Sequence, residues 1–129
     1  MSVSPKDFHE QAIRLAKQNS EIDSRSAISR SYYYVYHCAV ATAKRLSLPN
    51  CEKRDAGVHE RLFLKFEAQG KALTKIARRL QKQKRLRGVA DYDLDENVPA
   101  CEAEIYLRET LLLTGDLERL GLARQEANK

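Results

Sequence analysis

Arg30 and His37 are the residues of this chain best suited to chemistry, and they lie seven positions apart in the segment Ser-Arg-Ser-Tyr-Tyr-Tyr-Val-Tyr-His. On an α-helix seven residues turn the chain by about 700°, so both side chains leave one face, about 10 Å apart along the axis. A guanidinium binds phosphate, and an imidazole exchanges a proton near neutral pH. One interpretation of this pattern is metal-independent RNA cleavage, in which His37 would be the general acid or base and Arg30 would stabilise the phosphate. The alternative, which spacing alone favours, is a packed histidine and an arginine in a surface ion pair.

Four tyrosines surround this pair in the sequence. Tyr33 and Tyr34 flank the line from Arg30 to His37, where each could stack on a base, donate to a phosphate or pack in an oligomer interface. Tyr32 is expected on the core side of the same helix, together with Tyr36. Aromatic packing between helices is the alternative for each tyrosine taken alone.

A basic run extends from Lys71 to Arg87 and contains eight cations and no acid. Five of the cations recur at helical spacing, so they form a stripe that could follow an RNA backbone or be an ordinary solvated helix face. The stripe consists of Lys71, Lys75, Arg78, Lys82 and Arg85.

The other ionisable residues give weaker signals. Asp91, Asp93, Asp95 and Glu96 resemble a calcium loop but lack the glycine and glutamate that such a loop needs, so a capping or ion-pair role is expected. His9 is expected on an exposed helix face, and His59 is expected as a buried, hydrogen-bonded histidine at a helix start. No two histidines have metal-ligand spacing and no phosphate-binding glycine loop occurs, so neither a metal nor a cofactor is predicted.

Amphipathic patterns and cap residues predict the elements that must position these side chains. Ser4 is expected to cap the first helix and Asp23 or Ser24 the second, and Gly88 is expected to end the fourth. The tail after about residue 122 is polar and is expected to fray. The five predicted helices cover 5–19, 23–48, a segment from 58, a segment ending near 88 and a segment from about 99. The apolar positions expected inside are Phe8, Ala12, Leu15, Ile28, Tyr32, Val35, Ala39, Leu46, Val58, Leu62, Phe63, Phe66, Ala72, Leu73, Ile76, Leu80, Ile105, Tyr106, Leu111, Leu112, Leu113, Leu117 and Leu120.

Bulk properties agree with a single all-α domain, an antiparallel bundle of four to five helices over residues 1–129. Apolar residues make up 43% of the chain, which argues against disorder. No apolar run is long enough to cross a bilayer and no signal segment opens the chain, so a cytoplasmic protein is expected. Cys38, Cys51 and Cys101 form no paired motif and are expected to be reduced, mostly packed thiols. The net charge of +5 is compatible with nucleic-acid binding.

Three segments, taken in order, resemble the HEPN superfamily (higher eukaryotes and prokaryotes nucleotide-binding), in particular its short stand-alone branch. The signature Arg-x-Tyr-Tyr-x-x-x-His corresponds to residues 30–37, and a histidine that opens the next helix corresponds to His59. The element Arg-x-x-Ala-Asp-Tyr corresponds to residues 87–92. The resemblance covers nearly the whole chain.

The resemblance implies a homodimeric helical bundle and, as in many members, a metal-independent endoribonuclease. Arg30 and His37 of both protomers would meet in one cleft at the dimer interface and leave 2′,3′-cyclic phosphate ends. Asp91 and Tyr92 would line or brace that cleft. Many members are toxins paired with a small nucleotidyltransferase antitoxin, whereas others are non-catalytic modules that bind a nucleotide, an RNA or a protein. One toxin subgroup has a modified tyrosine two residues after the histidine, where this chain has Ala39.

Overall fold

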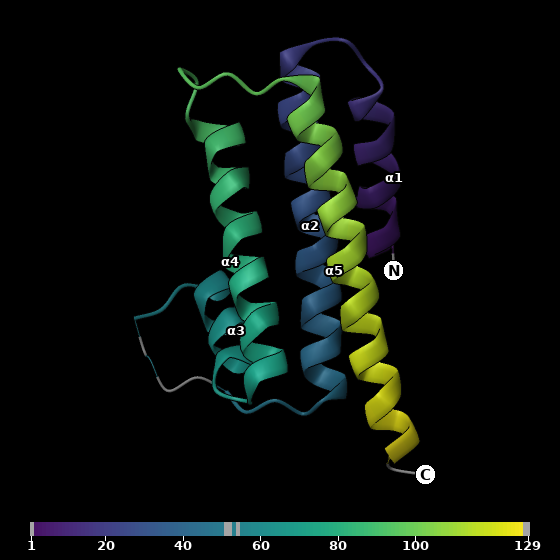
Figure 1. Cartoon of the computed structure of the whole chain (residues 1–129), viewed down its shortest axis with the longest axis vertical. Helices are drawn as coiled ribbons and strands as arrows, with labels where there is room; N and C mark the ends of the chain where they lie inside the picture. The colour runs from purple at the N-terminus through teal and green to yellow at the C-terminus, as the bar shows by residue number, and fades with distance from the viewer. Residues whose placement is uncertain (1, 51–52, 54, 128–129) are drawn as a thin grey trace.

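Five α-helices pack into one bundle in the computed structural model, which describes residues 2–50, 53 and 55–127 (Figure 1). The all-α prediction is therefore confirmed, and the described residues contain no strand. None of the helices in this part of the chain is both long and apolar enough to cross a membrane. The helices are α1 (Pro5–Ala16), α2 (Glu21–Arg45), α3 (Val58–Glu67), α4 (Lys71–Tyr92) and α5 (Ala100–Ala127).

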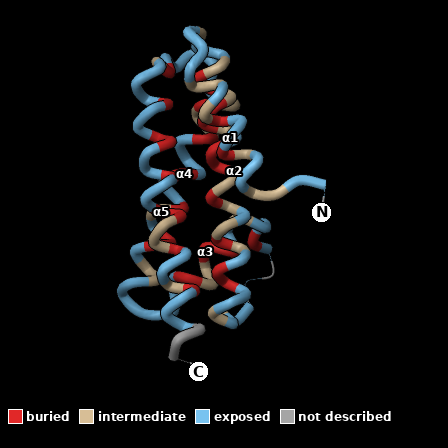
Figure 2. Tube along the Cα trace, turned by 90° about the vertical axis from the view of Figure 1, so that its right-hand side faces the viewer, coloured by how far each residue is buried: buried red, intermediate tan, exposed pale blue. Residues whose placement is uncertain are grey.

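The central element is α2, which contacts each of the other four helices. Figure 1 shows α1 and α4 running antiparallel to α2, and the short α3 beside the N-terminal half of α4. In Figure 2 the buried positions form bands along the inner sides of the helices. On α2 these positions include four of the five predicted core residues, Ile28, Tyr32, Val35 and Ala39, with Leu46 only half-buried.

The ends of α2 differ from the prediction because two turns have stronger caps than expected. Ser20, rather than Asp23 or Ser24, is the N-cap, and its side chain accepts a hydrogen bond from the Asp23 backbone N–H at 3.2 Å. At the other end Ser47 has a left-handed φ of 51°. The N–H of Leu48 donates to the Ala43 carbonyl at 3.0 Å, so a Schellman motif ends the helix at Arg45.

The fourth helix passes through Gly88, so the prediction that it ends there is wrong. The reason lies in Arg25 of α2, whose guanidinium is buried at the far end of α4. Its Nη1 donates to the Ala90 and Asp93 carbonyls, both at 3.0 Å, and its Nη2 donates to the Glu96 carbonyl. Because these C-terminal carbonyls gain a cationic donor, the helix continues to Tyr92.

The start of α1 at Pro5 agrees with the prediction, with Ser4 as the N-cap and its N–H donating to the Asp7 carboxylate at 2.7 Å. That helix ends at Ala16, three residues earlier than expected. The last helix continues to Ala127, where a frayed tail was expected, and residues 128–129 lie outside the described residues, as does Cys51. Cys38 is half-buried, but Cys101 is exposed rather than packed. Five apolar positions expected inside are exposed: Val58, Ala72, Ile105, Leu111 and Leu112.

A buried polar network joins three helices in the middle of the bundle. Thr110 of α5 has no exposed surface, and its Oγ1 accepts from Ser31 Oγ at 2.7 Å and from Gln83 Nε2 at 2.9 Å. The Tyr106 hydroxyl donates to the Gln83 carbonyl at 2.9 Å. Because each of these groups is paired, the network fixes the register of α2, α4 and α5.

Candidate active site

Arg30 and His37 lie on the same side of α2, and both are exposed. The His37 ring stacks on Phe8 of α1, with 5.6 Å between centroids, and meets the edge of Tyr36 at 5.3 Å. Within the described residues no hydrogen bond or ion pair involves either the Arg30 guanidinium or the His37 imidazole. Both groups are therefore available to an external ligand.

The first helix covers part of this face of α2, which was not predicted. Phe8 contacts Tyr33 as well as His37, with ring centroids 5.9 Å apart in the first case. His9 is buried rather than exposed, and it stacks on Tyr34 at 4.8 Å. The first helix therefore supplies aromatic side chains beside His37 and the tyrosines of α2.

Three segments far apart in the sequence meet at Tyr32, which has no exposed surface. Its hydroxyl lies 2.5 Å from Nδ1 of His59, at the start of α3. The Arg87 guanidinium of α4 lies over the Tyr32 ring at 5.0 Å and over the Tyr33 ring at 5.7 Å. These contacts join the three motif segments, which begin at residues 30, 59 and 87.

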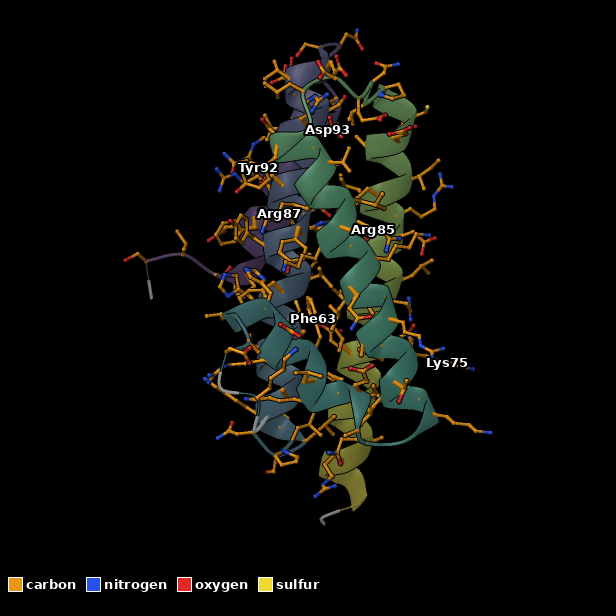
Figure 3. All side chains as sticks on the ribbon, turned by 90° about the vertical axis from the view of Figure 1, so that its left-hand side faces the viewer. Phe63, Lys75, Arg85, Arg87, Tyr92 and Asp93 are labelled. Carbon is orange, nitrogen blue, oxygen red and sulfur yellow. The ribbon has the colours of Figure 1, made fainter. Side chains whose placement is uncertain are left out.

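Arg87 is itself held by an acidic group on the same helix. Asp91 lies one turn further along α4 and forms an ion pair with Arg87 at 3.3 Å, and it accepts from Ser29 Oγ of α2 at 3.2 Å. Figure 3 shows Arg87 among the stick side chains beside α2, on a different side of α4 from Lys75, which extends away from the bundle. Asp91 thus braces the cation that lies over the tyrosines.

The buried setting decides the protonation of the groups at Tyr32. Burial raises the pKa of the Tyr32 phenol, so it stays protonated and can donate a hydrogen bond. Burial lowers the pKa of His59, and the nearby charges of Lys84 and Arg87 lower it further. His59 is therefore neutral at pH 7, as its place against the buried tyrosine requires.

Two residues predicted for the cleft do not join this cluster. Tyr34 is half-buried and stacks on His9. Burial raises the pKa of its phenol. Tyr92 is 77% exposed at the end of α4 (Figure 3). Tyr34 leaves α2 on a different side from Tyr32, and Tyr92 leaves α4 on a different side from Arg87. Each side chain therefore points to other neighbours or to solvent.

The five cations of the predicted basic stripe are all exposed on α4. Figure 3 shows Lys75 and Arg85 on the outer side of this helix. Arg79, which is not part of the stripe, is half-buried and forms an ion pair with Asp116 of α5 at 2.6 Å. The exposed side of α4 therefore has cations that are open to an anionic partner.

A groove with a volume of about 290 Å³ lies elsewhere, between α4 and α5. The lining of this groove is mainly apolar and includes Leu86, Ile105 and Leu113. Of the residues predicted for the site, Lys82 alone lines it. In the described part of the chain no group of three or more His, Cys, Asp or Glu side chains is placed to hold a metal ion.

Sequence reasoning missed four residues of the site: Phe8, Ser29, Tyr32 and Arg87. For Arg87 a signal was present, because it opens the Arg-x-x-Ala-Asp-Tyr element, but the helix boundary predicted at Gly88 separated it from Asp91. Phe8 was expected inside the bundle, but its contacts with Tyr33 and His37 could not be predicted because the side on which α1 packs depends on the tertiary fold. No model of a known protein family matches the chain, and a search of curated proteins found no match.

Proposed function

We propose that this chain is a metal-independent endoribonuclease of the HEPN type that acts as a homodimer, with Arg30 and His37 of both copies forming one composite site. The observation that supports it is the meeting of three motif segments at Tyr32, directly beside an exposed Arg30–His37 face. The five exposed cations of α4 provide an additional surface that suits an RNA backbone.

The chemistry needs one base, one acid and a cation. His37 takes the proton of the ribose 2′-OH, and the 2′ oxygen attacks the adjacent phosphorus. Arg30 stabilises the added negative charge on the phosphoryl oxygens. The bond from phosphorus to the 5′ oxygen breaks, and that oxygen takes a proton from the His37 of a second copy. The products are a 2′,3′-cyclic phosphate and a 5′-OH.

A second copy is proposed because the mechanism uses two histidines at once, one as the base and one as the acid. Each copy supplies one His37. On the same helix Ala41 and Lys44 are exposed, which leaves this face open toward its C-terminal end. A second α2 placed antiparallel would bring the Arg30 of one copy toward the His37 of the other.

The proposed partner of a HEPN toxin is a small nucleotidyltransferase antitoxin, and here this partner rests on the resemblance. The tyrosine that is modified in one toxin subgroup is replaced by Ala39, which has no exposed surface. Nucleotide attachment at this position is therefore not part of the proposal. Neutralisation would have to occur by direct binding or at another residue.

The test is RNA cleavage by purified protein in EDTA. Wild type should release 2′,3′-cyclic phosphate ends, and a substrate with a 2′-deoxy sugar at the cleaved position should resist. His37→Ala and Arg30→Ala should each lower the rate at least about 100-fold, the usual effect of removing a proton-transfer or charge-stabilising group. The control is Arg14→Ala, an exposed arginine of α1, which should keep wild-type activity.

Full activity in either site variant would refute the mechanism. Binding of RNA without any cleavage by wild type would instead support the non-catalytic HEPN module. The dimer is tested separately by sedimentation, where Ala41→Glu should shift the mass toward one protomer. A wild-type monomer at the concentration of the cleavage assay would remove the composite site.

A further inference from the structure

His59 is held in a fixed orientation by two tyrosines of α2. Its Nδ1 lies 2.5 Å from the Tyr32 hydroxyl, and its ring packs against Tyr32 at 5.5 Å and Tyr36 at 4.7 Å between centroids. Two ring contacts and one hydrogen bond leave the imidazole little freedom to rotate. The side chain is half-buried, so one edge of the ring reaches solvent.

The hydrogen bond to Tyr32 also decides the tautomer of His59. The Tyr32 hydroxyl is buried, and Nδ1 of His59 is the one acceptor that it contacts among the described residues, so its O–H donates and Nδ1 accepts. In a neutral imidazole the remaining hydrogen is then on Nε2. His59 therefore presents a fixed Nε2–H donor rather than a group that exchanges protons.

This donor has no partner of its own and lies in cationic surroundings. Within the described residues no hydrogen bond involves the Nε2 of His59. Lys84 and Arg87 act on the His59 ring as positive charges, and the buried Nε of Arg87 has no hydrogen-bond partner either. At the start of α3 the N-cap is Gly57, which has no side chain to satisfy the first backbone N–H groups. A solvent-facing N–H donor beside positive charges favours an anion.

We propose that His59 is a substrate-binding residue that donates through Nε2–H to a non-bridging oxygen of an RNA phosphate next to the phosphate attacked at Arg30 and His37. The position follows from Tyr36, whose ring contacts both the His37 and the His59 rings. The ligand class rests on the proposed ribonuclease function, whereas the donor and its tautomer rest on the contacts to Tyr32.

Two substitutions separate a donor from a packing residue. His59→Gln keeps an N–H donor close to the Nε2 position, and His59→Phe keeps the ring but removes both nitrogen atoms. Affinity is measured on the full chain with a 2′-deoxy oligonucleotide, which cannot be cleaved, by fluorescence anisotropy at low salt. One hydrogen bond to a charged group contributes about 1.5–3 kcal/mol, so His59→Phe should bind at least about tenfold more weakly. His59→Gln should stay within about threefold of wild type, as should the control Arg14→Ala, at an exposed residue of α1.

The second measurement is ¹⁵N NMR of the wild-type imidazoles, which does not depend on whether a variant folds. It should show His59 as the neutral Nε2–H form at pH 7, and the oligonucleotide should shift the Nε2 signal. In Tyr32→Phe the fixed tautomer should give way to a mixture.

Several outcomes would overturn the inference: an Nδ1–H tautomer, His59→Phe binding as tightly as wild type, His59→Gln binding as weakly as His59→Phe, or no binding of the oligonucleotide by wild type. The two proposals fail separately. If the binding results hold but wild type cleaves no RNA, the phosphate site stands and the ribonuclease is refuted. If wild type cleaves RNA but His59→Phe binds normally, the reverse applies.

Discussion

Replacing Arg25 by alanine should strongly destabilise the bundle, although this residue lies outside the proposed site. Only 8% of its side chain is exposed, and its guanidinium donates to carbonyls of Val89, Ala90, Asp93 and Glu96. Without it, the Ala90 carbonyl stays buried and unpaired, and the last turn of α4 loses its cationic cap.

The size of the effect follows from these contacts. Two donor nitrogens are lost, and hydrogen bonds that involve a charged group contribute about 1.5–3 kcal/mol each. Removing one partner from a buried charged network costs about 3–5 kcal/mol in other proteins, so we expect Arg25→Ala to lower the free energy of unfolding by about 4 kcal/mol. This is a large part of the about 5–15 kcal/mol by which domains of this size are stable.

The assay is urea unfolding followed by circular dichroism, with Arg79→Ala as the matched control. Arg79 also pairs between helices, with Asp116, but 35% of its side chain is exposed. Exposed ion pairs contribute about 0.2–1 kcal/mol, so the control should lose no more than that. Hydrogen exchange should also show early opening of residues 89–98 in Arg25→Ala. Equal losses for the two variants, or unchanged protection of residues 89–98, would refute the reasoning.

Three further predictions concern buried groups. Thr110→Val removes the oxygen that accepts from both α2 and α4, and it should lower the free energy of unfolding by about 2 kcal/mol. Thr110→Ser keeps that oxygen and should lower it clearly less. Equal losses for the two variants in urea unfolding would contradict the role of the oxygen. Burial raises the pKa of Cys38 to about 11, so at pH 8 iodoacetamide should label the exposed Cys101 faster than Cys38. Peptide mass spectrometry measures both labelling rates, and equal rates would contradict this prediction. Burial lowers the pKa of His9 below its value of 6.5 in the unfolded chain. The unfolded state therefore binds a proton at His9 more tightly than the folded state, so the stability of the fold falls as the pH drops below about 6.5. His9→Phe should therefore lose less stability than wild type between pH 7 and pH 5, and an unchanged pH dependence of unfolding would contradict this.

The number and order of the helices could be predicted because apolar spacing and local caps determine them. The stripe of α2 through Tyr32, Val35 and Ala39 is buried as expected, and Arg30 and His37 are on the exposed side. The predicted boundaries of α2 failed because local caps at Ser20 and Ser47 were not recognised, and the boundary at Gly88 failed because a distant residue acts on the helix end. Gly88 reads as a helix end in isolation, but Arg25 caps α4 from 64 or more positions away in the chain.

The candidate site could be predicted only in part, since its contacts join segments that local patterns treat separately. A tyrosine expected in the core proved to be the point where His59 and Arg87 meet. Two residues expected in the cleft, Tyr34 and Tyr92, lie outside the cluster because helix rotation and side-chain direction are set by neighbours such as α1 and α5. Helical spacing places residues on a face, but it does not say what covers that face.

The position of Tyr32 has a consequence for how this chain can vary. Its hydroxyl orients His59, and its ring lies under Arg87, so a substitution at any one of these three positions changes what the other two contribute. Their effects should be epistatic: once Tyr32 becomes phenylalanine, a second change at His59 should cost much less than it does in the original chain. Tyr32, His59 and Arg87 should therefore co-vary, so sequences that descend from this one should keep all three residues or lose them together.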